Sequence, residues 1–213
     1  NICEIAEELD LFVVCDEIYC ELVYSTAERV KLSTVIGKAC GISLRGISKE
    51  FPWPGSRCGW MEVYNKKKDK QFEKYIETIL KAKRLEVCST TLPQMAIRTV
   101  YNNPLYKEHK QFRVKKYEER AREAMEIFSG KNGIIPIEPK GAFYMIILFD
   151  ESLLNPGQKL EIENEKVRNR IEELCSVKHI ENDKRFAYYL LGATGIITVP
   201  LTGFYSKRKG IRI

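Results

Sequence analysis

Residues 11–19 read LFVVCDEIY, and this stretch decides the fold class of the chain. Its unbroken apolar run has the length of a β-strand, and the lack of polar alternation predicts a parallel strand covered on both faces. The run ends at Asp16, and in open parallel sheets the carboxyl ends of strands face the ligand crevice. Asp16 and Tyr19 are therefore candidates for contact with a bound heterocycle, although an aspartate at a strand end often only caps a turn.

Helical and strand-like segments alternate outward from this run. Apolar spacing predicts helices over residues 2–9, 70–84, 114–128, 167–175 and 185–191, and one that begins near Pro93. Strands are expected over residues 43–48, 59–64, 134–137, 142–148, 196–201 and from 211 onward. This order predicts an α/β fold, part of a doubly wound and mostly parallel sheet, followed by a smaller α+β part. The break at Asn102, Asn103 and Pro104 divides residues 1–103 from residues 104–213.

Composition excludes several classes of protein. The chain has 213 residues with 35 Lys and Arg against 29 Asp and Glu, and the net charge of +6 is spread along it, which disfavours nucleic-acid binding. No apolar run approaches the roughly 18 residues that span a bilayer. The seven cysteines lack the spacing of a zinc site, and several lie in apolar runs. Buried free thiols in a reducing compartment, the cytoplasm, are expected, with no metal.

A second candidate feature is the sequence GISK at residues 46–49, which precedes a loop rich in Pro and Gly and then Arg57. A lysine that leaves a strand into a rigid turn can be partly desolvated, which favours the neutral amine that forms an imine. Arg57 offers planar, always-charged donors for a phosphate or carboxylate. The alternative is that both residues are simply solvated, and Ser48 with Lys49 alone is weak support.

A third candidate is Arg212, in the terminal sequence GIRI of residues 210–213. Strand geometry places Ile211 and Ile213 on one face and Arg212 on the other. If the isoleucines face a core, the guanidinium points outward, where it either lines a cleft or stays hydrated.

Taken together, five blocks resemble the class I and II aminotransferases, which are fold-type I pyridoxal-phosphate enzymes. The blocks are DEIY at 16–19, SKEFPWPGSRCGW at 48–60, KGAFY at 140–144, TGIITVP at 194–200 and GIRI at 210–213. The pattern Ser-Lys-x4-Pro-Gly-x-Arg-x-Gly is the most specific of them. Residues 140–144 and 195–200 look most like the alanine and tyrosine aminotransferase branches. Gly46 departs from many relatives, which have a phosphate-binding serine there.

The resemblance implies a role for each matching residue. Lys49 would hold pyridoxal 5'-phosphate as an imine (a Schiff base) and then move a proton from the substrate α-carbon. Asp16 would pair with the pyridine nitrogen and keep it protonated. Tyr19 would hydrogen-bond the ring hydroxyl. Ser48 and Arg57 would also bind the cofactor, with Arg57 on its phosphate. Arg212 would bind the α-carboxylate of the substrate.

The implied function is transamination between an amino acid and a 2-oxo acid by a homodimer. A C–S lyase or β-lyase, another fold-type I enzyme, or a regulator domain that senses the cofactor remains an alternative, because these share the same residues. The family's Asn-Pro-x-x-Pro-Thr-Gly segment and its glycine-containing phosphate loop would precede Asn1, so the chain resembles the C-terminal half of such an enzyme. We expect that half, alone, to bind cofactor weakly and to be nearly inactive.

Overall fold

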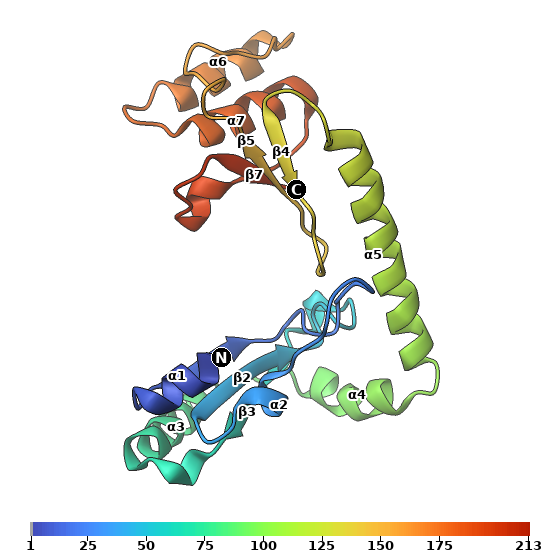
Figure 1. Cartoon of the computed structure of the whole chain (residues 1–213), viewed down its shortest axis with the longest axis vertical. Coiled ribbons are helices and arrows are strands. Elements are labelled where there is room, and N and C mark those ends of the chain that lie inside the picture. The colour runs from blue at the N-terminus through green and yellow to red at the C-terminus, as the bar shows by residue number, and fades with distance from the viewer. Residues whose placement is uncertain (1) are drawn as a thin grey trace. The chain divides into compact units, whose positions relative to one another are not determined.

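The structure is a computed structural model that describes residues 2–213. The chain forms two compact units, Asn1–Lys116 and Tyr117–Ile213. The boundary lies inside the long helix α5 (Tyr106–Phe128), which begins in the first unit and ends in the second (Figure 1).

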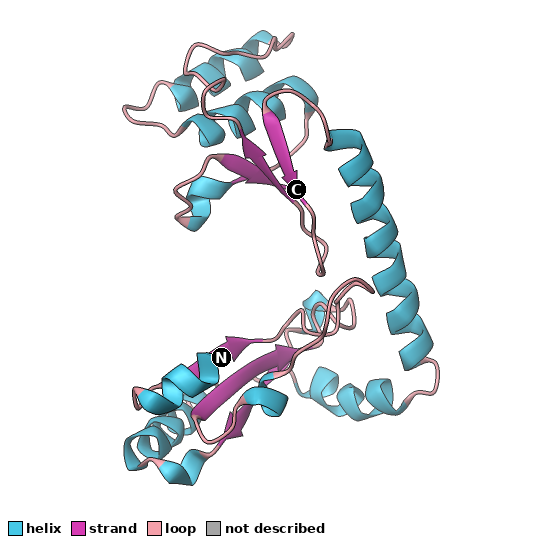
Figure 2. Cartoon of the chain, viewed as in Figure 1, coloured by secondary structure: helices cyan, strands magenta, loops and turns pink. Residues whose placement is uncertain are grey.

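The first unit is a three-stranded sheet with helices on it (Figure 2). Strand β1 (Phe12–Asp16) runs parallel to β2 (Cys40–Gly46), and β2 pairs antiparallel with β3 (Gly59–Tyr64). The other elements are α1 (Ile2–Glu8), α2 (Leu32–Val35), η1 (Pro54–Ser56), η2 (Lys66–Lys68), α3 (Lys70–Lys83) and α4 (Thr91–Asn102). Pro93 lies in the first turn of α4, where its missing N–H leaves no helical bond unmade, as predicted.

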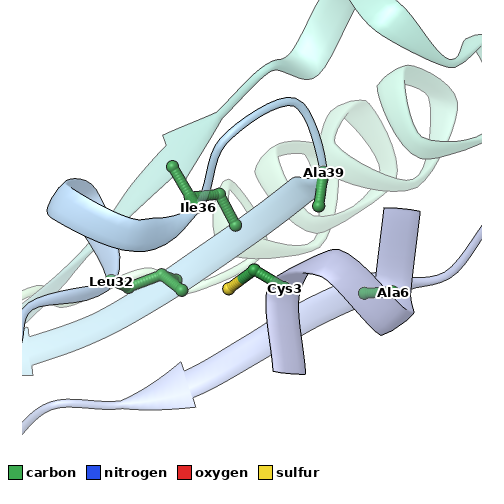
Figure 3. Packing of buried hydrophobic residues seen from close by; sticks show 5 residues of the cluster. All are labelled: Cys3, Ala6, Leu32, Ile36 and Ala39. Atoms are coloured by element: carbon green, nitrogen blue, oxygen red, sulfur yellow. The ribbon is translucent and has the colours of Figure 1, made fainter. Parts of the chain in front are cut away.

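Two apolar clusters pack this unit. Cys3 and Ala6 of α1 meet a second group of buried side chains from α2 and the segment after it, Leu32, Ile36 and Ala39 (Figure 3). A separate cluster joins Cys40 and Ile42 of β2 to Phe72 and Ile76 of α3. Each buried aliphatic or aromatic side chain contributes roughly 1.5–3 kcal/mol. Helices therefore pack on the sheet through two distinct clusters, which is the α/β arrangement expected from the sequence.

Strand β1 differs from the prediction that both its faces are covered. Phe12 is 46% exposed and Val14 is 54% exposed, whereas Val13 and Cys15 pack against the α1 and α2 cluster. The described helices leave Val14 largely uncovered, and β1 also lies at the edge of the described sheet, where it pairs only with β2. One face of the apolar run is therefore largely exposed. On that face Phe12 contacts α3, with its ring centroid 5.3 Å from that of Phe72.

The second unit contains a four-stranded antiparallel sheet with two helices. Its strands, in the spatial order β4-β5-β7-β6, are β4 (Ile134–Ile137), β5 (Ile146–Phe149), β7 (Gly210–Arg212) and β6 (Val199–Pro200). Helices α6 (Glu165–Cys175) and α7 (Asn182–Thr194) pack through their own cluster around Ile171 and Tyr189. Phe186 of α7 covers Ile147 and Phe149 of the sheet.

Two expected strands of this unit are shorter than predicted. In place of residues 196–201 the structure has β6 and then the 3-10 turn η3 (Leu201–Phe204), and Ile197 is 78% exposed. Gly195 ends α7 in the left-handed conformation at φ 76°, so the chain leaves the helix before it can join the sheet. The strand expected from residue 142 begins only at Ile146, because Ala142 is left-handed at φ 58°.

All seven cysteines are free thiols, as expected from their spacing. Burial was predicted as well, and it holds for Cys3, Cys40, Cys58 and Cys175, whereas Cys88 is exposed. Among residues 2–213, no helix has the length and apolar character that crossing a membrane requires.

Candidate active site

The parallel pairing of β1 with β2 brings their carboxyl ends to one edge of the sheet. Asp16 is the last residue of β1 and lies opposite Leu44 of β2. The N–H of Glu17 donates to the carbonyl of Leu44 at 2.9 Å and extends the pairing by one residue. The turn that carries Lys49 follows the end of β2 at Gly46. Two of the three sequence-predicted features thus leave the sheet at the same edge, as expected for a parallel pair.

Lys49 and Tyr19 contact each other at this edge. The Nζ atom of Lys49 lies 5.8 Å from the centroid of the Tyr19 ring, and both residues are half-buried. An ammonium at that distance from an aromatic face is attracted by the ring quadrupole. The lysine side chain is therefore directed toward the segment that follows Asp16.

Asp16 presents a carboxylate without a cationic partner among the described residues. Its Oδ1 atom accepts a hydrogen bond from the backbone N–H of Ile18 at 3.1 Å, and the side chain is exposed. That bond fixes the carboxylate at the strand end through a short turn. The remaining lone pairs face solvent and are available to a protonated nitrogen of a ligand.

Arg57 follows the turn η1 in a left-handed backbone conformation, with φ 50° and ψ 41°. For a residue other than glycine this conformation is strained by about 1–3 kcal/mol, and such strain concentrates at functional sites. Its Nη1 donates to the carbonyl of Pro54 at 3.0 Å, and Thr90 Oγ1 donates to the Arg57 carbonyl at 3.2 Å. Within residues 2–213 no carboxylate lies within ion-pair distance of this exposed guanidinium. Ser48 is half-buried in the turn before Lys49.

Gly46 is required by the close approach of β2 and β3. It lies opposite Gly59, and a Cβ atom on Gly46 would lie 2.9 Å from the carbonyl oxygen of Cys58. A Cβ on Gly59 would lie 2.8 Å from the carbonyl oxygen of Arg45. The serine that many relatives carry at position 46 therefore does not fit this backbone unless the strands shift.

Arg212 belongs to the second unit, where two aromatic rings lie close to its guanidinium. The Tyr144 ring centroid lies 4.3 Å from its Cζ atom and the Phe204 centroid lies 4.5 Å away. No carboxylate or carbonyl of the described residues bonds this guanidinium, which lines a cavity of about 430 Å³. The alternation predicted for GIRI holds for buried Ile211, whereas Ile213 is 39% exposed.

Sequence reasoning missed three buried carboxylates near these residues, those of Glu17, Glu21 and Glu50. Glu17 accepts hydrogen bonds from the N–H of Leu32 at 2.8 Å and from the Ser43 hydroxyl. A signal was present, because Glu17 directly follows Asp16 and Glu50 directly follows Lys49. Such neighbours hold the backbone of site residues in place.

Glu21 is a buried carboxylate that stays charged. Burial alone would raise its pKa, but hydrogen bonds from Lys110 and Lys31 outweigh burial and lower the pKa from 4.5 to about 2. Tyr101 and Tyr106 respond in the opposite direction. Burial raises the pKa of both phenols, and the neighbouring Glu50 carboxylate raises it further. The hydroxyls therefore remain protonated donors.

The family model for aminotransferase class I and II matches residues 1–213 of the chain. The chain belongs to this family. It is 48% identical over 213 residues to an uncharacterized aminotransferase of Methanocaldococcus jannaschii, covering 100% of this chain and 49% of the relative. Glutamate-pyruvate aminotransferase AlaA of Escherichia coli K12 is 30% identical over 158 residues, which are 73% of this chain and 38% of that protein.

Solved structures agree on the fold of this aminotransferase family. An alanine aminotransferase from Pyrococcus furiosus superposes with a TM-score of 0.77 and 23% identity, over 99% of this chain and 46% of that one. The match shows that the chain has the fold of these enzymes, as the resemblance predicted. The chain spans about half the length of the relatives it matches.

Class I and II aminotransferases generally use pyridoxal phosphate, and the donor set of the first unit fits that group. An amine suits its aldehyde, a carboxylate without a cationic partner suits its ring nitrogen, and a guanidinium without an acidic partner suits its phosphate. The sheet edge brings together Asp16, Tyr19, Ser48 and Lys49, and Arg57 follows in the same unit. Arg212 is in the other unit.

Proposed function

We propose that the protein containing this chain is a pyridoxal 5'-phosphate-dependent aminotransferase that moves an amino group between an amino acid and a 2-oxo acid. Family membership supports the reaction class. The observation that carries the proposal is the Lys49 amine, held 5.8 Å from the Tyr19 ring at the sheet edge where Asp16 ends β1. That edge is where an open α/β sheet binds its ligand.

Each candidate site residue of the first unit has a proposed role in binding the cofactor or in its chemistry. When bound, the cofactor supplies an electron-accepting ring that stabilises negative charge at the substrate α-carbon. Lys49 would hold the aldehyde carbon through Nζ, with loss of water, and its amine, when free, would carry the α-proton. Asp16 keeps the pyridine nitrogen protonated through its unpaired carboxylate. Tyr19 donates to the ring hydroxyl, and Ser48 and Arg57 bind the cofactor, with Arg57 on the phosphate.

Arg212 has the proposed task of binding the substrate carboxylate. Tyr144 and Phe204 lie close to its guanidinium, with ring centroids 4.3 Å and 4.5 Å from Cζ, and the planar edge of the group carries N–H donors for hydrogen bonds. A planar carboxylate matches that edge with two parallel bonds. The task explains why the arginine has no acidic partner in its own unit.

We also propose the organisation that the resemblance implies. Residues 1–103 would form the C-terminal part of the cofactor-binding domain, and residues 104–213 the connecting helix and small domain of a homodimer. A cytoplasmic location is supported by seven cysteines that are all free thiols. Amino acid metabolism, with no nucleic-acid or membrane partner, completes the proposal.

The test uses the full-length protein supplied with pyridoxal phosphate. Alanine, aspartate or tyrosine is offered with 2-oxoglutarate, and formation of glutamate is measured. Lys49→Ala is expected to abolish the activity, whereas Lys67→Ala, at an exposed lysine of η2, is the matched control and should be active. Release of pyruvate and ammonia without a 2-oxo acid would instead establish lyase chemistry. Absence of any turnover, together with cofactor binding, would favour a sensing role.

A further inference from the structure

A buried arginine donates hydrogen bonds to the backbone of the turn that carries Lys49. Arg113, in α5, donates from Nη1 to the carbonyl oxygen of Lys49 at 3.0 Å and to that of Glu50. Its side chain is buried, with the residue only 8% exposed. A buried guanidinium is unfavourable unless its donors are satisfied, so the two carbonyls are strong partners for it.

The side chain of Glu50 fixes the same turn through a second set of contacts. Its carboxylate accepts hydrogen bonds from the hydroxyls of Tyr101 at 3.0 Å and of Tyr106, and Arg45 Nη2 lies 3.7 Å away. Tyr101 is in α4 and Tyr106 is the first residue of α5. Glu50 is 4% exposed, so these bonds are shielded from competing water.

These contacts determine the direction in which the lysine side chain leaves the backbone. The side chain of a lysine is flexible. Its amine stays in one place only when the direction of the Cα–Cβ bond is fixed and another group contacts the amine. Arg113 and Glu50 fix the backbone on the carbonyl side of Lys49. Tyr19 receives the amine 5.8 Å from its ring centroid.

We propose that Arg113 is a positioning residue for Lys49, with Glu50, Tyr101 and Tyr106 as the second anchor of the same turn. This inference deepens the proposed function. It rests on that function only for the reason why Lys49 needs a fixed position, namely to reach the cofactor. Arg113 touches neither cofactor nor substrate in this role. It keeps the amine where an aldehyde at the sheet edge can reach it.

The test compares two kinds of amine chemistry at Lys49 in the full-length protein. Arg113→Ala should slow capture of pyridoxal phosphate by Lys49, trapped with borohydride and located by peptide mass spectrometry, by about tenfold. The same change in cofactor-free protein should speed competitive acetylation of Lys49 by acetic anhydride, because the freed side chain becomes more accessible. Arg113→Lys should restore part of both rates.

The matched control is Arg122→Ala, at an exposed arginine on the same helix. It should leave both rates at Lys49 unchanged. If Arg113→Ala fails to fold, Tyr106→Phe, which removes one bond to Glu50 and keeps the ring, replaces it with smaller changes in the same directions.

The possible outcomes separate the two proposals. Unchanged acetylation and capture at Lys49 in folded Arg113→Ala, or equal acceleration at every lysine, would overturn the positioning role. Wild-type protein that shows no cofactor capture at Lys49 would overturn the proposed function. The acetylation rates of cofactor-free protein still decide whether Arg113 positions the amine in that case.

Discussion

The Lys49 amine lies 5.8 Å from the centre of the Tyr19 ring, although each residue follows a different strand. The contact exists because β1 and β2 are parallel, so the turns after both strands begin at one edge of the sheet. The distance is that of an ammonium above an aromatic face. The ring and the hydroxyl of Tyr19 therefore have separate roles, the ring toward the amine and the hydroxyl toward the proposed cofactor.

Tyr19→Phe keeps the ring below the amine and removes only the hydroxyl. We expect the free energy of unfolding to stay within about 0.5–1 kcal/mol of wild type, since the half-buried Tyr19 side chain loses only one hydroxyl. Transamination should fall about tenfold, because the proposed hydrogen bond to the cofactor is missing. Steady-state kinetics and thermal unfolding measure the two effects. If Tyr19→Phe is as active as wild type, the Tyr19 hydroxyl has no role in binding the cofactor.

Arg212→Lys replaces a planar fork with a compact ammonium. We expect KM for the amino acid to rise about tenfold or more, because the two parallel bonds proposed to the carboxylate and the contacts of the guanidinium with Tyr144 and Phe204 are both lost. Cofactor capture by Lys49 should stay unchanged. Arg120→Lys, at an exposed position of α5, is the control and should leave KM as it is. An unchanged KM in Arg212→Lys would refute the carboxylate role.

Gly46→Ala tests the close approach of β2 and β3. A methyl group there would lie 2.9 Å from the Cys58 carbonyl oxygen, so we expect a loss of about 1–3 kcal/mol in the free energy of unfolding. Urea unfolding measures it. Gly55→Ala is the matched control, because a Cβ there meets nothing within 4 Å, and it should be neutral or slightly stabilising. Equal stability of both variants would contradict the packing described here.

The lowered pKa of Glu21 predicts that the free energy of unfolding depends on pH. Its pKa is lowered from 4.5 to about 2 because hydrogen bonds from Lys110 and Lys31 outweigh the effect of burial. A lowered pKa in the folded state stabilises the protein above the unfolded pKa, and this contribution is lost as the pH falls through the folded value. We therefore expect the free energy of unfolding to fall between about pH 5 and pH 2.

The measurement is urea unfolding of wild type and Glu21→Gln across that interval. The variant should be less stable near neutrality, and its stability should change less with pH, because the titrating group is gone. Glu28→Gln, at an exposed carboxylate, should follow the wild-type curve. Parallel curves for Glu21→Gln and wild type would show that another carboxylate carries the dependence.

Local sequence predicted most elements of the fold. The sequence predicts a strand over residues 59–64 and a helix over residues 70–84, and the structure has β3 at Gly59–Tyr64 and α3 at Lys70–Lys83, because side-chain periodicity depends only on near neighbours. The α/β class followed from the order of these elements. Periodicity could not show that β1 has an uncovered face, since the apolar run at 11–15 has the composition of a strand covered on both sides.

The sequence by itself determined the family and pointed to Asp16, Tyr19, Lys49, Ser48, Arg57 and Arg212 as the candidate site, because short blocks with fixed spacing carry that information. Only the tertiary structure decided that the Lys49 amine contacts the Tyr19 ring and that Arg113 hydrogen-bonds the turn that carries Lys49. Arg113 and Glu50 stand far apart in the sequence, in segments that no spacing rule connects. Their contact arises because Arg113 of α5 lies against the turn after β2, and burial strengthens the hydrogen bond from its guanidinium to the Glu50 carbonyl.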